Sequence, residues 1–262
     1  MMVEEKSSTY HHADKVGNKA DVWKHFILFN IFKSWLSIRS NRKPIRYAET
    51  HSGQGIYSLG SVGAWQSGVG YIYESDLLGE DGYIDVQRTA YSDHQQYLGS
   101  WVLVQSILEK QQYPYQITLC DTNRHVMESI GEMELDRTKV ALHVCDGYQY
   151  IENILGDLDF VFIDPPYVPD LVRERQACQQ LIKKLDDAGV AWLLWYPIIT
   201  SIDPWSLIDN KRTNVFDVRW LPDQGYPDPQ MIGCGVFAAD QLITIIDSLV
   251  PELNCLKRIL EN

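Results

Sequence analysis

Short apolar runs that end at polar residues alternate with amphipathic stretches along most of the chain. The most distinct run, residues 158–167 (LDFVFIDPPY), is rich in branched and aromatic side chains, as in a buried central strand. Pro165 and Pro166 have no N–H and cannot extend a sheet ladder, so the backbone is expected to turn away at Asp164. Similar runs predict a first strand from Arg46 and further strands at 115–120, 140–145, 190–195, 215–221 and 232–238, with the last two antiparallel.

Amphipathic spacing predicts helices between these strands. Val22, Phe26, Phe29 and Trp35 indicate one helix over residues 19–38, and others are expected over 101–108, 171–185 and 240–260. Ser100 is a residue type that commonly caps helices, so we expect it to cap the helix over 101–108, which does not exclude a ligand contact. Strands that alternate with helices in this way predict an α/β fold with a parallel sheet.

The alternation of strands and helices is interrupted after the first strand, which leads into a turn containing Gly53 and Gly55. Such glycines permit close backbone approach to a cofactor, although any tight turn would use them. In dinucleotide-binding folds the ribose-binding acid follows this turn by about 20 residues, whereas the next suitable acid here is Asp121. We therefore expect an inserted, largely helical subdomain over the site, or a long ordered loop, at residues 60–99. The main domain would comprise residues 1–59 and 100–262.

Polar residues stand where four of the predicted strands end: His51, Asp121, Asp146 with Gly147, and Asp164. The carboxyl ends of parallel strands share one edge of a sheet, and open α/β sheets bind ligands there. Asp121 is the right type to accept both hydroxyls of a ribose, and Asp146 could accept from an adenine amino group. Each aspartate could equally cap the next helix, and His51 could merely satisfy its turn.

Asp164, a prolyl carbonyl and the Tyr167 ring would meet at the end of the central strand. The exocyclic amino group of a nucleobase is a poor nucleophile because its lone pair is delocalised into the ring. A carboxylate and a carbonyl that accept its two N–H bonds favour the pyramidal nitrogen that can attack a methyl group. Tyr167 could stack on the extruded base. The alternative is that Asp-Pro-Pro is only a strand-ending turn.

The segment 10–25, YHHADKVGNKADVWKH, leads into the first helix through a turn at Gly17 and Asn18. Lys24 and His25 would lie within the first two turns of that helix, near its positive end. This arrangement suits an anion or a ligand carboxylate. The alternative is a surface lysine beside a packed or capping histidine.

The formal net charge of −12 argues against a protein that coats nucleic acid through bulk electrostatics. The charge is uneven, because residues 11–46 carry a local +6 and the remainder carries −18. This asymmetry would suit a phosphate-facing surface, or simply a solvated helix face.

At 262 residues the chain can bury a full α/β core. It shows no signal-peptide core, no apolar run long enough to cross a bilayer and no zinc-ligand spacing. The five cysteines lack any CxxC pair and are expected to be reduced thiols. We expect a cytoplasmic protein without a metal.

Five motifs, YHHADKVGNKADVWKH, THSGQG, CDG at Cys145, IDPPY and LWYPII at Leu194, resemble in order and spacing the RlmJ family of 23S ribosomal RNA adenine-N6-methyltransferases. The resemblance implies a Rossmann-like class I methyltransferase sheet with an inserted helical subdomain. It implies S-adenosyl-L-methionine as methyl donor and N6 of an adenine in 23S rRNA as acceptor. We expect a monomer that binds no membrane.

The same resemblance assigns roles to individual residues. Asp164 would be the catalytic residue, holding the amino group and accepting its proton. The cofactor would be contacted by His25, His51, Ser100, Asp121, Asp146, Gly147 and Asp164. The RNA substrate would be contacted by Tyr10, His12, Lys24, Pro165 and Tyr167.

The chain departs from the family's pattern at four positions. The family usually has Arg at His11, His at Lys15, Pro at Trp101 and Glu at Asp121, where the shorter acid is an equivalent acceptor. Some members of the group have been described as proteins for catabolism of external DNA. The alternative is therefore a non-catalytic nucleic-acid-binding protein linked to DNA uptake, or a DNA adenine methyltransferase. A normal DPPY motif argues against the non-catalytic alternative.

Overall fold

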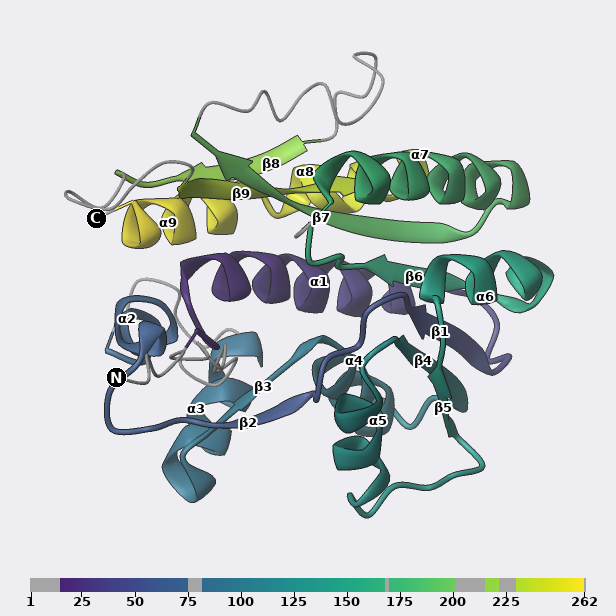
Figure 1. The fold of residues 1–262 in the computed structure, drawn as a ribbon, viewed down its shortest axis with the longest axis horizontal. Helices are drawn as coiled ribbons and strands as arrows, with labels where there is room; N and C mark the ends of the chain where they lie inside the picture. The colour runs from purple at the N-terminus through teal and green to yellow at the C-terminus, as the bar shows by residue number, and fades with distance from the viewer. Residues whose placement is uncertain (1–14, 75–81, 168–169, 201–214, 222–229, 262) are drawn as a thin grey trace, which may run out of the picture.

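A computed structural model describes residues 15–74, 82–167, 170–200, 215–221 and 230–261. Within these ranges the fold is built around a seven-stranded sheet of order β5-β4-β1-β6-β7-β9-β8 (Figure 1). Every strand that the apolar runs predict is present, and the bounds shift little except at the end of β7. The strands are β1 (Ile45–Glu49), β4 (Tyr115–Asp121), β5 (Val140–Val144), β6 (Phe160–Ile163), β7 (Ala191–Ile199), β8 (Val215–Arg219) and β9 (Met231–Ala238).

The sheet is mostly parallel. Strands β5, β4, β1, β6 and β7 pair in the parallel sense, and β9 and β8 add an antiparallel pair at one edge, as expected. The chain enters the middle of the sheet at β1, continues to one side through β4 and β5, and returns to the other side at β6. The loops after β1 and β6 therefore diverge at a topological switch point, where open α/β sheets bind ligands. The predicted α/β fold is confirmed.

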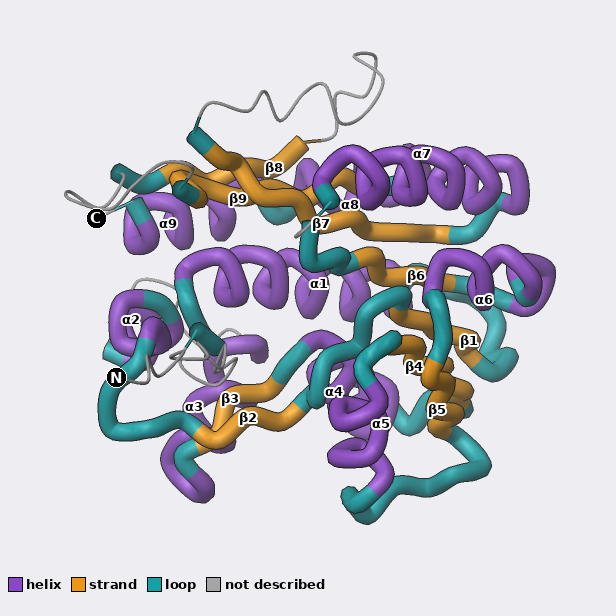
Figure 2. The backbone as a smooth tube through the Cα atoms, in the orientation of Figure 1, coloured by secondary structure: helices purple, strands orange, loops and turns teal. Residues whose placement is uncertain are grey.

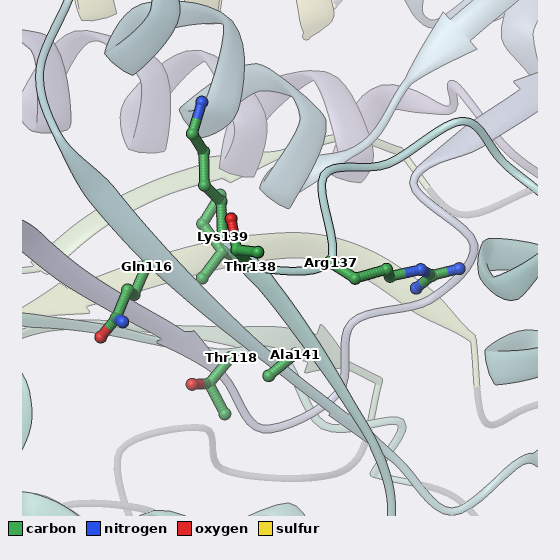
Figure 3. A pocket seen from close by; sticks show the side chains of 7 residues that line it. Gln116, Thr118, Arg137, Thr138, Lys139 and Ala141 are labelled. Atoms are coloured by element: carbon green, nitrogen blue, oxygen red, sulfur yellow. The ribbon is translucent and has the colours of Figure 1, made fainter.

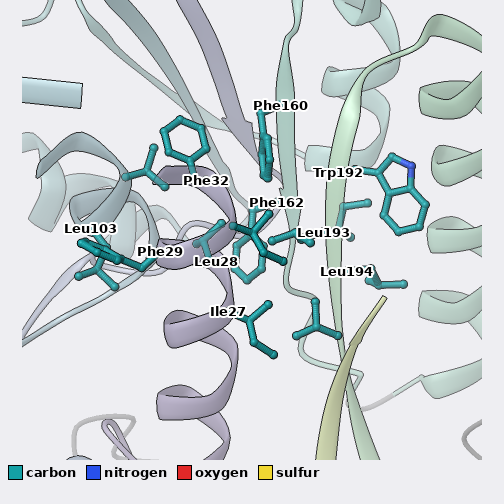
Figure 4. Packing of buried hydrophobic residues seen from close by; sticks show 14 of the residues in the cluster. Ile27, Leu28, Phe29, Phe32, Leu103, Phe160, Phe162, Trp192, Leu193 and Leu194 are labelled. Carbon is teal, nitrogen blue, oxygen red and sulfur yellow. The ribbon is translucent and has the colours of Figure 1, made fainter. Parts of the chain in front are cut away.

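Helices cover both faces of the sheet. On one face α1 (Lys19–Ser37) contacts α4 (Ser100–Lys110), α8 (Ile243–Ser248) and α9 (Val250–Leu260). On the other face α6 (Gly147–Asn153) packs against α7 (Leu171–Ala188). Figure 4 shows Phe32 of α1 on the same side as Phe160, whereas Trp192 points to the opposite side. There the Trp192 indole N–H donates to Asp186 of α7, 2.8 Å away.

An aromatic cluster fixes α1 against the two strands of the switch point. The Phe160 ring lies 5.2 Å, centroid to centroid, from both Phe32 and Trp35, and Phe32 lies 5.6 Å from Tyr47. These contacts are edge-to-face, and each contributes about 0.5–1.5 kcal/mol beyond the burial of its area. The cluster therefore holds the helix that carries Lys24 and His25 against β1 and β6.

The segment between β1 and α4 packs beside α1 (Figure 2). Tyr83 of this segment lies edge-on to Phe26 and Phe29 of α1. The helices agree with the expectation for this segment, but the antiparallel strand pair was not predicted, because three-residue strands carry no periodic signal. Its division from the main domain at residues 60 and 99 stays a prediction. The described elements are β2 (Ile56–Ser58), η2 (Ala64–Ser67), α2 (Val69–Tyr73), α3 (Gly82–His94) and β3 (Gln96–Leu98).

Two predicted boundaries were wrong, and both involve proline. The single helix expected over 240–260 is divided into η5 (Asp240–Leu242), α8 and α9, because Pro251 in the first turn of α9 cannot continue the preceding helix. Strand β7 runs through Pro197 instead of closing there. Beyond Leu194 it has lost β6 as a neighbour and pairs with β9 alone, so a residue without an N–H is accommodated.

The predicted first helix, over residues 19–38, is confirmed as α1, with Asn18 as its N-cap. The side-chain oxygen of Asn18 accepts from the N–H groups of Ala20 and Asp21, at 2.8 and 3.0 Å. Among the helices that the structure describes, none combines the length and apolar character that crossing a bilayer requires.

Candidate active site

Asp164 stands at the switch point, directly after the last residue of β6. Its carboxylate accepts from Lys24 Nζ at 2.7 Å, and Lys24 also pairs with Asp21 at 3.0 Å. The same ammonium lies 5.2 Å from the centroid of the Trp195 ring, a cation–π contact. The structure thus joins the predicted catalytic acid to the predicted substrate-contacting lysine of α1.

The electrostatics of this cluster favour charged groups. Burial alone would lower the pKa of Lys24, but the carboxylates of Asp164 and Asp21 outweigh it and raise that pKa. Burial would raise the pKa of Asp21, but Lys24 and the other groups around it hold that pKa below its usual value. The side chains of Lys24 and Asp164 are 13% and 15% exposed, so the pair is shielded yet reaches the surface of the site.

Glu49, the last residue of β1, is part of this cluster and was not singled out in the sequence. Its side chain is fully buried, and its two oxygens accept from the Tyr47 hydroxyl at 2.5 Å and the Ser100 hydroxyl at 2.8 Å. Burial raises the pKa of Glu49 to about 8, although both hydroxyl donors oppose the shift. The sequence offered one signal for Glu49, which is an acidic residue at the end of the first predicted strand.

Ser100 is not the N-cap of α4, as its sequence position suggested. Gly99 takes that place without a side-chain hydrogen bond, and Ser100 begins the helix. Its hydroxyl donates to Glu49 instead, because the start of α4 lies against the end of β1. Ser100 is 4% exposed, and its contact with a cofactor stays a prediction.

His25 lies on the second turn of α1 and is 4% exposed. Burial, reinforced by the neighbouring Lys24, lowers the pKa of His25 to about 3, so the ring is neutral. Its Nδ1 lies 2.6 Å from the Tyr97 hydroxyl of β3.

The loops after β1, β4 and β5 converge along the carboxyl edge. Asp121 accepts the backbone N–H of Gly53 at 3.3 Å and that of Asn123 at 2.8 Å, so it joins two of these loops. A Cβ on Gly147 would lie 2.1 Å from the carbonyl oxygen of Thr50, so only glycine allows this close approach.

Asp146 caps α6, which confirms the capping alternative for this residue. Its carboxylate accepts the Tyr148 backbone N–H at 3.0 Å and lies 3.7 Å from the Arg173 guanidinium. His51 contacts the Thr50 hydroxyl at 2.9 Å and packs edge-on against Tyr148, and burial lowers its pKa to about 4. The four predicted strand-end residues therefore lie along one edge, while their ligand contacts stay predictions.

Tyr167 has a left-handed backbone, with φ of 56°, directly after the two prolines. Its hydroxyl donates to the Trp195 carbonyl at 2.8 Å, and the side chain is 3% exposed. The ring presents no open face in this conformation, so the predicted stacking on a base requires the ring to turn. Pro165, two residues before Tyr167, is buried, and Pro166 is exposed.

Two predicted substrate residues, Tyr10 and His12, lie outside the described residues. In the part of the chain that the structure does describe, no group of three or more His, Cys, Asp or Glu side chains is placed to hold a metal ion. A small pocket of about 170 Å³ lies away from the candidate site, at the opposite end of β4 and β5 (Figure 3). It is lined by Gln116, Ile117, Thr118, Arg137, Thr138, Lys139 and Ala141.

Comparison with known proteins gives a family and a fold. The RsmJ family profile, described as "Ribosomal RNA large subunit methyltransferase D, RlmJ", matches residues 42–217. Two proteins named "Ribosomal RNA large subunit methyltransferase J" are similar to this chain. That of Escherichia coli K12 is 29% identical over 73% of this chain and 70% of its own length. That of Haemophilus influenzae Rd is 26% identical over the same shares.

A solved structure from Legionella pneumophila strain Philadelphia 1 superposes with a TM-score of 0.68. The superposition covers 92% of this chain and 94% of that one, at 22% identity, and it shows that the two share a fold.

Proposed function

Because the chain belongs to the RlmJ family of ribosomal RNA large subunit methyltransferases, we propose that it methylates N6 of an adenine in 23S rRNA. It is an S-adenosylmethionine-dependent rRNA methyltransferase, as its family implies. The observation that carries the finer assignment is Asp164, which stands with a prolyl carbonyl at the switch point and pairs with Lys24 at 2.7 Å.

The residues at the carboxyl edge fit S-adenosylmethionine. Gly53 and Gly55 have φ of 56° and 79°, and a Cβ on Gly53 would lie 2.4 Å from the Tyr57 hydroxyl, so the first turn is tight. Asp121 would accept the ribose hydroxyls, and Asp146 with Gly147 would hold the adenine end. His25, His51, Ser100 and Asp164 would hold the amino acid end. When bound, this cofactor supplies a methyl group on a positively charged sulfur.

Asp164 and the prolyl carbonyl would accept the two N–H bonds of the target amino group and favour its pyramidal form. Asp164 is paired with Lys24 at 2.7 Å, and a carboxylate is only a weak base. A weak base is sufficient, because the nitrogen becomes strongly acidic once it carries the methyl group and a positive charge. Asp164 would therefore orient the amine before transfer and take its proton afterwards.

We further propose that the enzyme acts as a monomer, as the family resemblance leads us to expect. A metal is not required by this chemistry, since a carboxylate and a carbonyl supply the two acceptors. An enzyme that modifies ribosomal RNA would act in the cytoplasm.

The test is methyl transfer by Asp164→Asn and Asp164→Ala. Radiolabelled S-adenosylmethionine and 23S rRNA from a strain lacking the modification would report transfer, and mass spectrometry would locate N6-methyladenine. Both variants should lose transfer yet still bind the cofactor by calorimetry, with at most a modest loss of affinity, because Asp164 is one of several residues that would hold it. Asp157→Ala, at an exposed acid paired with Arg46, is the matched control and should stay active.

Full activity of Asp164→Ala would refute the mechanism. A single-stranded DNA of the same sequence belongs in the same assay. Equal or faster methylation of that DNA would favour the DNA methyltransferase alternative, and binding without transfer to either would favour the non-catalytic alternative.

A further inference from the structure

His25 of α1 is linked to the inserted segment through the hydroxyl of Tyr97. The His25 Nδ1 lies 2.6 Å from this hydroxyl, which in turn lies 3.5 Å from the hydroxyl of Tyr83 on α3. The three side chains are 4%, 1% and 0% exposed. Buried hydroxyls and ring nitrogens must find partners within the protein, so the direction of each hydrogen bond matters.

At the far end of this series of contacts, Gln87 contacts Tyr83 and the backbone of Leu98. Its side-chain oxygen accepts the Leu98 N–H at 2.9 Å, and its amide nitrogen donates to the Leu98 carbonyl at 2.7 Å. This two-sided contact with the backbone permits one assignment of the amide oxygen and nitrogen. The contacts with Tyr97 and Gln87 both lower the pKa of Tyr83 against the effect of burial.

The two distances give the Tyr97 proton one good acceptor. A hydrogen bond from the Tyr97 hydroxyl to the Tyr83 hydroxyl, at 3.5 Å, would be long. The His25 Nδ1 at 2.6 Å is within ordinary hydrogen-bond distance. The Tyr97 hydroxyl donates to Nδ1, and the neutral imidazole then carries its single proton on Nε2.

The Nε2 nitrogen is available to a ligand. In the described part of the chain His25 makes its hydrogen bond through Nδ1, and Nε2 does not belong to the polar atoms sealed in the core without a partner. A neutral ring with its proton on Nε2 offers one N–H donor and no charge. This donor suits a carboxylate oxygen, such as that of the amino acid end of S-adenosylmethionine.

We propose that Tyr97 is a positioning residue that fixes His25 in the Nε2–H form, so that the inserted segment sets the donor pattern of the cofactor site. This proposal rests on the proposed function for its ligand. The assignment of the proton itself does not depend on any ligand. The inserted segment thereby acquires a role in cofactor binding besides covering the site.

The first test is the nitrogen-15 NMR spectrum of the histidine rings in the full-length protein without ligand. His25, assigned by comparison with His25→Gln, should show an unprotonated Nδ1 and a protonated Nε2 at neutral pH. A protonated Nδ1 would overturn the proposal. This measurement needs neither catalysis nor RNA.

The second test is the affinity for S-adenosylmethionine, measured by calorimetry. Tyr97→Phe should bind roughly tenfold more weakly, the usual effect of losing one hydrogen bond, with kcat at saturating cofactor unchanged. Tyr83→Phe should keep the wild-type nitrogen shifts and affinity, because Tyr97 still donates to Nδ1. Tyr73→Phe is the matched control, since the Tyr73 hydroxyl is buried without a partner among the described residues.

Wild-type affinity in Tyr97→Phe would overturn the positioning role. A loss equal to that of Tyr73→Phe would do the same, because it would reflect packing alone. Absence of cofactor binding in the wild type would refute the proposed function instead, and the nitrogen shifts would still decide the position of the proton.

Discussion

Replacing Glu49 by Gln should change how the stability of the protein depends on pH. Glu49 is fully buried, and burial raises its pKa from 4.5 to about 8. Gln has the same shape and can still accept from one of the two neighbouring hydroxyls and donate to the other. The substitution therefore removes the titration while keeping the packing.

The direction of this pH dependence follows from the protonation of Glu49 in the folded and unfolded states. Between about pH 4.5 and pH 8 the folded protein keeps a proton on Glu49 that the unfolded chain has released, so raising the pH through this window favours unfolding. Each pH unit in this window lowers the free energy of unfolding of the wild type by about 1.4 kcal/mol, which amounts to roughly 3 kcal/mol between pH 5 and pH 7. Above the folded pKa this contribution no longer changes.

The assay is urea unfolding of the ligand-free protein at pH 5, 6, 7 and 8. Other groups titrate in this range, so the informative quantity is the free energy of unfolding of Glu49→Gln minus that of the wild type. This difference should become more positive by about 3 kcal/mol from pH 5 to pH 7, because the wild type loses stability that the variant keeps. The m-values should be unchanged.

Glu132→Gln, at the exposed end of α5 (Arg124–Gly131), is the matched control and should follow the wild type at every pH. A difference between Glu49→Gln and the wild type that stays constant within about 0.5 kcal/mol would refute the reasoning. Glu49 would then be ionised when folded, and its two hydroxyl donors would have outweighed burial.

Three further substitutions test the site. Gly147→Ala should lower stability by about 1–3 kcal/mol in thermal unfolding, because its Cβ would lie 2.1 Å from the Thr50 carbonyl oxygen, and an unchanged Tm would contradict this. Lys24→Met should abolish methyl transfer and destabilise the protein by about 3 kcal/mol, since it leaves Asp164 shielded without its cation, whereas near-wild-type kcat would show the pair to be dispensable. Asp121→Asn should weaken S-adenosylmethionine binding about tenfold in calorimetry, with unchanged affinity arguing against its contact with the ribose.

The sequence predicts the strands and the positions of the residues at their carboxyl ends well, because both are local signals. An apolar run that stops at a polar residue marks the end of a buried strand, and parallel pairing then gathers His51, Asp121, Asp146 and Asp164 on one edge. Prolines within elements were less predictable. Pro197 lies inside β7 because β6 has already ended, which depends on the neighbour and not on the segment itself.

The contacts that support the site depend on residues far apart in the chain. Ser100 looked like a cap, yet its hydroxyl reaches Glu49 across 51 positions, and His25 meets Tyr97 across 72 positions. No local pattern encodes such pairs. The acid at the end of β1 could have been noticed, but its burial and its two donors become evident only when α4 is placed.

The position of α1 also bears on how the protein folds during synthesis. This helix buries apolar side chains against β9, α8 and α9, and the Trp23 indole donates to the Phe216 carbonyl 193 positions later. In a nascent chain the apolar side chains of α1 that pack against β9, α8 and α9 are therefore uncovered until those elements leave the ribosome. A circular permutant that makes α1 after β9 should therefore aggregate less during its synthesis.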